Sequence, residues 1–231
     1  MVIKGTKKQK RTSIYIGAGI VAVICLSMAM LTGTRTVSSC RADIDGDGLE
    51  DTMQITGRGI GRFGDNLVIR TQNGEQIYDF SDWRPWKVQT ADVDGDGDIE
   101  VSVGVFKTTR FDPEYKKRPF LYNWDQDGIS PKWLGSRLSR EFEDYIFADV
   151  DGDGSDDILS VELLPDGGKV INAYRWKGFG FIGLGESRAF DDIGLIEAGS
   201  AGSRINAKVK LSGKWQWVTL VYQNEQLILE D

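Results

Sequence analysis

The chain has 231 residues, of which 40% are hydrophobic and 27% charged, with 28 Gly and only 5 Pro. This composition is typical of a globular protein and excludes collagen and wholesale disorder. The net charge of −7 excludes nucleic acid as an expected partner, because phosphate binding needs a basic face. The chain has no histidine, which excludes Ser-His and Cys-His nucleophilic enzymes. Its two cysteines are too few for a disulfide framework.

The charge is divided unevenly along the chain. Five basic residues lie in the first eleven positions, and no acidic residue occurs before Asp43. The remainder therefore holds 23 basic and 35 acidic residues, a net charge of −12. We expect a basic cytoplasmic head at residues 1–13, joined to an acidic body.

An uncharged segment of 23 residues separates Arg11 from Arg35. Its apolar centre, residues 14–31, would span about 27 Å as a helix, close to the thickness of a hydrocarbon core. We therefore predict a transmembrane helix or signal anchor at residues 14–33 and a linker at residues 34–41. Since basic flanks stay in the cytoplasm, we expect a single-pass protein of the cell membrane with its C-terminal domain outside.

Two other fates of this segment remain open. Residues 37–40 resemble a bacterial lipobox, which would make the chain a lipoprotein anchored at Cys40. Simple secretion after cleavage of a signal peptide is the other alternative.

The body, residues 42–231, contains one acidic motif three times. Each copy reads D-x-D-G-D-G-x-x-[DE], and the copies begin at Asp43, Asp92 and Asp149. The spacings of 49 and 57 residues are those of one propeller blade or a similar supersecondary unit.

The motif predicts a calcium loop. Closely spaced carboxylates repel one another unless a cation lies among them, and calcium accepts six to eight oxygens in a flexible shell. Glycines at the fourth and sixth positions allow the chain to turn tightly at positive φ. We predict side-chain ligands at positions one, three, five and nine, and a backbone carbonyl at position seven. The predicted ligands of about three Ca²⁺ ions are Asp43, Asp45, Asp47, Leu49 and Asp51; Asp92, Asp94, Asp96, Asp98 and Glu100; and Asp149, Asp151, Asp153, Ser155 and Asp157.

Three other interpretations of the motif compete with the calcium loop. An EF-hand needs Glu at position twelve and a helix on each side, but position twelve is Gln54, Val103 or Ser160, and the residues that follow predict strands. A magnesium site is not favoured by a flexible cage with many protein oxygens. The third interpretation is an acidic turn without metal.

The acidic loops, the strand that follows each loop and the period together resemble FG-GAP/VCBS-type repeats, the β-propeller repeats also found in integrin α subunits. The resemblance covers roughly residues 40–180. It implies calcium-stabilised blades and a role in extracellular recognition or adhesion, without specifying a ligand.

The remaining residues also predict strands and turns. An Asn-Gly pair at residues 73–74 predicts a hairpin, and the tail from Ile205 predicts three more strands of a fourth unit. In that unit the calcium loop would have degenerated to residues 197–200. We therefore predict an all-β fold: a small β-propeller-like repeat domain of about four blades, with an N-terminal transmembrane helix.

The expected function is that of a calcium-binding, membrane-anchored surface repeat domain. It would act in binding or adhesion to an unknown surface glycan or protein ligand, without catalysis. One alternative is a surface carbohydrate-active hydrolase or lyase that uses two carboxylates outside the metal loops. The other is a structural component of the cell envelope.

Overall fold

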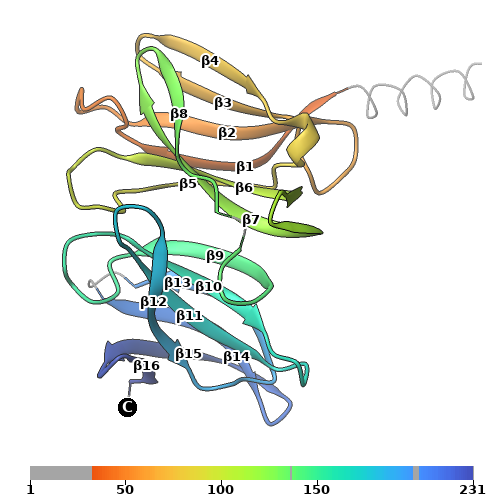
Figure 1. Cartoon of the computed structure of the whole chain (residues 1–231), viewed down its shortest axis with the longest axis vertical. Helices are drawn as coiled ribbons and strands as arrows, with labels where there is room; N and C mark the ends of the chain where they lie inside the picture. The colour runs from red at the N-terminus through yellow and green to blue at the C-terminus, as the bar shows by residue number, and fades with distance from the viewer. Residues whose placement is uncertain (1–32, 136, 200–202, 231) are drawn as a thin grey trace, which may run out of the picture.

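The computed structural model describes residues 33–135, 137–199 and 203–230, and these residues form an all-β protein (Figure 1). Apart from one turn of 3₁₀ helix, η1 (Ser81–Trp83), the regular elements are strands. In chain order the strands are β1 (Thr34–Ala42), β2 (Asp51–Arg58), β3 (Asn66–Thr71), β4 (Gly74–Asp79), β5 (Lys87–Ala91), β6 (Glu100–Thr109), β7 (Asp112–Asp125), β8 (Gly128–Trp133), β9 (Phe142–Ala148), β10 (Asp157–Leu163), β11 (Lys169–Trp176), β12 (Phe181–Ser187), β13 (Asp192–Ala198), β14 (Arg204–Leu211), β15 (Lys214–Gln223) and β16 (Gln226–Leu229).

Each run of four consecutive strands forms one antiparallel up-and-down unit. We call β1–β4, β5–β8, β9–β12 and β13–β16 the first, second, third and fourth sheets. The third and fourth are joined by a short parallel pairing of β12 with β16, so that they make one eight-stranded sheet. The predicted hairpin at the Asn-Gly pair is confirmed, since Thr71 pairs with Gly74 at the turn between β3 and β4.

The four sheets lie in a row rather than in a closed ring. Figure 1 shows the first and fourth sheets at opposite ends of the molecule, and in the described ranges no strand of one pairs with a strand of the other. The described sheets therefore do not close into a ring. The pairing of β12 with β16 removes two strand edges within the last two sheets instead.

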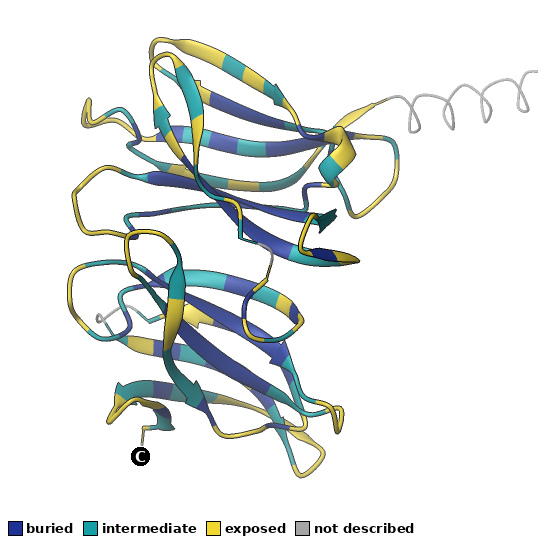
Figure 2. Ribbon diagram, in the orientation of Figure 1, coloured by how far each residue is buried: buried dark blue, intermediate teal, exposed yellow. Residues whose placement is uncertain are grey.

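Two apolar cores lie between facing sheets. One core joins β2 and β3 of the first sheet to β6 and β7 of the second, with fully buried residues such as Ile55, Leu67 and Val103. The other joins the third sheet to the fourth, through residues such as Leu159 and Val209. Figure 2 shows these buried positions along the central strands. Removal of this apolar surface from water is the main stabilising contribution to the fold.

The second and third sheets meet through aromatic rings and polar links. Tyr145 of β9 is fully buried, and its hydroxyl hydrogen-bonds Ser102 of β6 at 2.9 Å. Lys87 of β5 donates to Asp144 of β9 at 2.6 Å. The two cores are thus parts of one continuous structure.

The segment expected as a linker, residues 34–41, is instead most of β1, which pairs with β2 along its length. Thr, Ser and Arg alternate with half-buried positions such as Val37 and Cys40. The strand lacks the apolar run that predicts a buried strand, because it lies at a sheet edge.

The expected basic head and residues 14–32 of the expected transmembrane helix lie outside the described residues. In the part of the chain that is described, no helix is long and apolar enough to cross a membrane.

Candidate metal centres

The three acidic motifs occupy equivalent places in the first three sheets. Each connects the first strand of its sheet to the second, over residues 43–50, 92–99 and 149–156. We call them loop 1, loop 2 and loop 3. All three lie on the same side of the row of sheets, on the left in Figure 1. The same connection in the fourth sheet is residues 199–203, whereas the predicted degenerate loop, residues 197–200, begins inside β13 and only overlaps it.

The backbone of each loop is wrapped around the first aspartate of the motif. In loop 1, the carboxylate of Asp43 accepts the backbone N–H groups of Asp47 and Gly48 at 3.1 and 2.8 Å. Gly46 and Gly48 have φ angles of 70° and 86°, a conformation that costs residues with a Cβ atom more than glycine. The equivalent bonds in loops 2 and 3 run from Gly97 to Asp92 and from Gly154 to Asp149.

The acid at position nine begins the second strand and is buried in all three motifs. Asp51, Glu100 and Asp157 are at most 2% exposed. Each accepts the backbone N–H of position two, at 3.0, 3.0 and 3.2 Å respectively. Burial raises the pKa of all three carboxyl groups, that of Asp157 to about 7, with a further contribution from neighbouring aspartates. Burial and neighbouring negative charges disfavour the ionised form of such a carboxyl group, and a cation beside it would stabilise that form.

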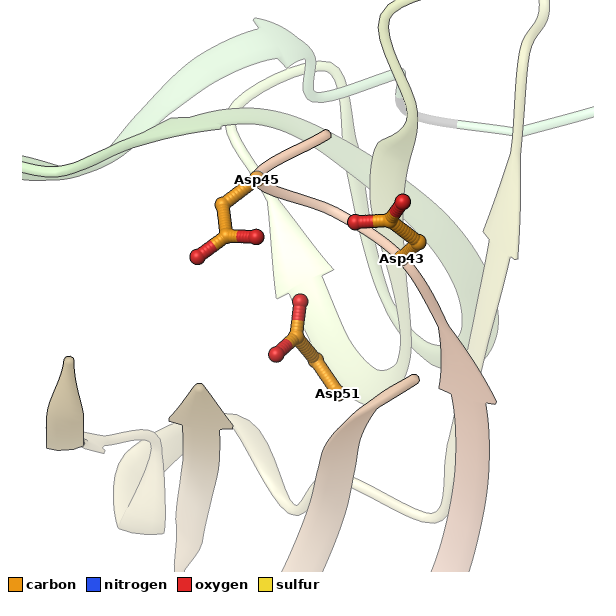
Figure 3. Close-up of side chains that lie close together, drawn as sticks. All are labelled: Asp43, Asp45 and Asp51. Carbon is orange, nitrogen blue, oxygen red and sulfur yellow. The ribbon is translucent and has the colours of Figure 1, made fainter. Parts of the chain in front are cut away.

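Three carboxylates converge in each motif. In loop 1 they belong to Asp43, Asp45 and Asp51, whose side chains point toward one another in Figure 3. One oxygen of each lies within 4.8 Å of the others. Two oxygens on opposite sides of one calcium ion would be about 5 Å apart, given calcium–oxygen distances of about 2.5 Å. The donor set therefore fits a calcium ion held by these three side chains.

The convergent sets of loops 2 and 3 differ from that of loop 1. They contain positions one, three and five: Asp92, Asp94 and Asp96; and Asp149, Asp151 and Asp153. Of the predicted side-chain ligands, Asp47, Glu100 and Asp157 thus lie outside the convergent sets. Asp47 instead accepts the N–H of Leu49 at 2.8 Å.

The predicted position-seven residues are held in the same way in all three loops. Their backbone N–H groups donate to the carboxylate of position five, in loop 2 from Asp98 to Asp96 at 2.9 Å and in loop 3 from Ser155 to Asp153 at 3.0 Å. Coordination by their carbonyl oxygens stays a prediction.

Basic side chains lie against loops 2 and 3, and the sequence analysis missed both. Lys132 of β8 is 2.5 Å from carboxylate oxygens of both Asp94 and Glu100. Arg175 of β11 pairs with Asp151. In the described ranges, no basic side chain pairs with the convergent carboxylates of loop 1. The Tyr-x-Trp segments of β7 and β11 match, but the middle residue is Asn123 in β7 and Arg175 in β11. This difference is the sequence signal that could have indicated a basic side chain beside loop 3.

Loops 2 and 3 are also joined to each other. Asp92 donates its N–H to the carboxylate of Asp156 at 3.0 Å, and its carbonyl accepts the N–H of Asp156 at 2.7 Å. A cavity of about 530 Å³ lies between the two loops and is lined in part by Lys132, Arg175 and Trp176. Binding at one of these loops is therefore expected to affect the other.

Neutralising Lys132 is expected to strengthen calcium binding at loop 2. In Lys132→Met, a side chain of similar length no longer competes with calcium for Asp94 and Glu100. Affinity for one of the bound ions should rise about fivefold, the equivalent of roughly 1 kcal/mol for a partly buried ion pair. Calcium titration calorimetry on the full chain measures this, with Lys177→Met, an exposed lysine at the same edge, as the matched control. Equal affinities in the two variants would contradict the assignment of Lys132.

Comparison with known proteins assigns no family to this chain. No model of a known protein family matches it, and no similar protein is found among curated sequences.

Proposed function

We propose that the protein is a calcium-binding repeat domain, anchored in the cell membrane and displayed outside it, which acts in binding or adhesion rather than catalysis. The observation that carries the proposal is the threefold recurrence of one loop structure. In each copy, a first aspartate organises the backbone, a buried ninth acid begins the next strand, and three carboxylates converge. In loop 1, where no basic side chain of the described residues pairs with the converging carboxylates, these groups would only repel one another without a cation.

The arrangement of the sheets supports a relationship to FG-GAP/VCBS-type propeller blades. Each of the four units is a four-stranded antiparallel sheet, and the acidic loop follows the first strand in three of them. The first strands of successive sheets are neighbours, with β5 beside β1 and β9, and β9 beside β13. Radially arranged blades place their first strands side by side in the same way. We propose an open row of propeller-like blades.

Strand β1 argues against the lipoprotein alternative. Processing at Cys40 would remove most of this strand, which pairs with β2 from Thr34 to Ala42. Cys40 itself packs against the core of the first two sheets, and burial raises the pKa of its thiol to about 12. These observations favour the retained anchor over processing at Cys40, while simple secretion with cleavage before Thr34 would leave β1 intact and stays an alternative.

An exposed aromatic face on the fourth sheet supports a binding role. Trp215 and Trp217 of β15 are 47% and 55% exposed, and their cross-strand partners on β14 are Lys210 and Lys208. The ring of Trp215 lies over Gly194, where a Cβ atom would be 3.2 Å from it. Flat, exposed aromatic rings beside cations suit a sugar or a protein partner.

The carbohydrate-active alternative needs two acids that are open to substrate. Glu162 and Glu186 share Arg140, but Glu162 is fully buried and also accepts hydrogen bonds from Ser160 and Asn172. This pair serves to hold β10, β11 and β12 together. The role as an envelope component would use the same sheets without a ligand-binding face.

Calcium-dependent recognition is tested by applying the full chain to glycan and protein arrays with calcium and with a chelator. We expect binding in calcium only, and loss of binding in Trp217→Ala without a change in melting temperature. Phe179→Ala, which removes another exposed ring, is the control and should bind normally. The proposed role would be contradicted by binding that requires neither calcium nor the Trp217 side chain, or by the absence of binding.

A further inference from the structure

One end of the first two sheets lies opposite the acidic loops and carries a different surface. It is formed by the start of β1, the β2–β3 connection, η1 and the β6–β7 turn, on the right in Figure 1. The β2–β3 connection is tied to the start of β1. Arg35 donates to the carbonyls of Gly59 and Phe63, both at 2.8 Å, and the N–H of Gly59 donates to the carbonyl of Gly33 at 3.3 Å.

Two large apolar side chains project from this end. Ile60, in the β2–β3 connection, and Phe111, in the β6–β7 turn, are each 83% exposed. We call them the apolar tips. Aromatic rings of the same segments pack together, with Phe63 and Phe106 at a centroid distance of 5.4 Å and Phe106 and Tyr115 at 5.7 Å. These contacts pack the β2–β3 connection, which carries Ile60, against β6 and β7.

Four exposed arginines lie in or next to the segments that form this end, and we call them the basic rim. They are Arg58, Arg62, Arg84 and Arg110. Three of them lie over aromatic rings, namely those of Phe63, Tyr115 and Phe111. The acids on β7 close to this end already have basic partners, since Asp112 pairs with Arg118 and Glu114 with Lys116. Asp65 and Asp82 also lie at this end, and Asp65 accepts the backbone N–H of Arg58 at 2.9 Å. Arg62 lines a cavity together with Glu141, Glu143 and Asp144, so the contact with headgroups falls to the other three arginines of the rim.

The expected membrane anchor joins the folded domain at this end, which points to a lipid surface as its partner. The uncharged segment of 23 residues ends at Arg35, and β1 begins at Thr34, so no spacer separates the expected anchor from the folded domain. An anchored domain without a spacer must lie against the lipid headgroups. Exposed apolar side chains surrounded by arginines are the combination that binds anionic interfaces.

We propose that this end is a membrane-contact face: the basic rim binds anionic lipid headgroups, and the apolar tips enter the headgroup boundary. The proposal rests on the membrane anchor of the proposed function and adds an orientation to it. The nine residues of β1 extend over about 30 Å at roughly 3.3 Å per residue. The calcium loops would therefore face away from the membrane, at the far end of β1, where a negative lipid surface does not repel them.

The test compares backbone hydrogen exchange of the full chain in nanodiscs of phosphatidylcholine with that in nanodiscs that also contain phosphatidylserine. We expect slower exchange at residues 58–64 and 109–112 with the anionic lipid, and unchanged exchange in the acidic loops. Arg110→Glu, next to the exposed Phe111, should reduce the difference between the two lipids. Ile60→Asp should reduce the protection of residues 58–64 in both lipids. Lys177→Glu makes the same charge change at the opposite edge and should retain the wild-type protection.

Two outcomes would overturn the proposal. One is equal exchange of residues 58–64 in both lipids, and the other is an Arg110→Glu variant that behaves like Lys177→Glu. Failure of the chain to insert into nanodiscs would overturn the anchor and this proposal together. Calcium content, measured on the same samples, reports separately on the metal sites, so that the two failures are distinguishable.

Discussion

Removing calcium from the full chain is expected to lower its melting temperature by several degrees for each site that empties. A ligand at 100 times its dissociation constant adds about 2.7 kcal/mol per independent site, which corresponds to roughly 5–10 °C for a protein of this size. The physical reason is that the converging carboxylates of each loop repel one another when no cation lies between them. Thermal unfolding followed by circular dichroism, in calcium and in a calcium chelator, measures the effect.

Magnesium and salt provide the controls for this experiment. Magnesium should restore less of the lost stability than calcium, because it demands a near-ideal octahedral shell and dehydrates reluctantly. Salt should restore a part, because it screens repulsion between the exposed carboxylates. The same melting temperature in chelator and in calcium would show that the loops are acidic turns without metal.

Asp157→Asn is expected to have opposite effects with and without calcium. In a chelator at about pH 8 the variant should be more stable than the wild type. Its amide still accepts the Val150 N–H, but the buried negative charge is removed. This gain should shrink toward about pH 5, because the raised pKa means that the wild-type carboxyl group is already protonated there. In calcium the variant should be less stable, with affinity at loop 3 lower by about tenfold or more, since ligand charge tunes calcium affinity.

The matched control is Asp127→Asn, which removes an exposed charge from the turn between β7 and β8. It should change neither the calcium affinity nor the stability in chelator by a comparable amount. Asp157 would have no part in metal binding if Asp157→Asn bound calcium as tightly as Asp127→Asn does. Stabilisation by Asp157→Asn in both conditions would lead to the same conclusion.

The local structure of the acidic loops was predictable because a nine-residue motif determines it. The positive φ angles of Gly46 and Gly48, the strand after each loop and the rejection of an EF-hand all follow from residue type and spacing. The strands of the tail were equally predictable, because residues 205–211 and 215–223 are separated by a short Ser-Gly turn at β14–β15. Such features depend on interactions between residues close in the sequence.

Features that depend on distant residues were not predictable in this way. Strand β1 is stabilised by pairing with β2 and by contacts of Val37 with the core, whereas its own residues read as a polar linker. Lys132 reaches loop 2 from a strand more than thirty residues further along the chain. The pairing of β12 with β16 joins strands about forty residues apart in the chain, and no local pattern indicates it.

The central claim, that the three acidic motifs are calcium sites, is tested most directly by counting bound calcium. The full chain is dialysed to equilibrium against calcium, and the metal is measured by elemental analysis against protein concentration. The account predicts about three calcium ions per chain, and the loss of one ion in each of the single variants Asp43→Asn, Asp92→Asn and Asp149→Asn. A chain that holds no more calcium than the dialysis buffer would contradict it.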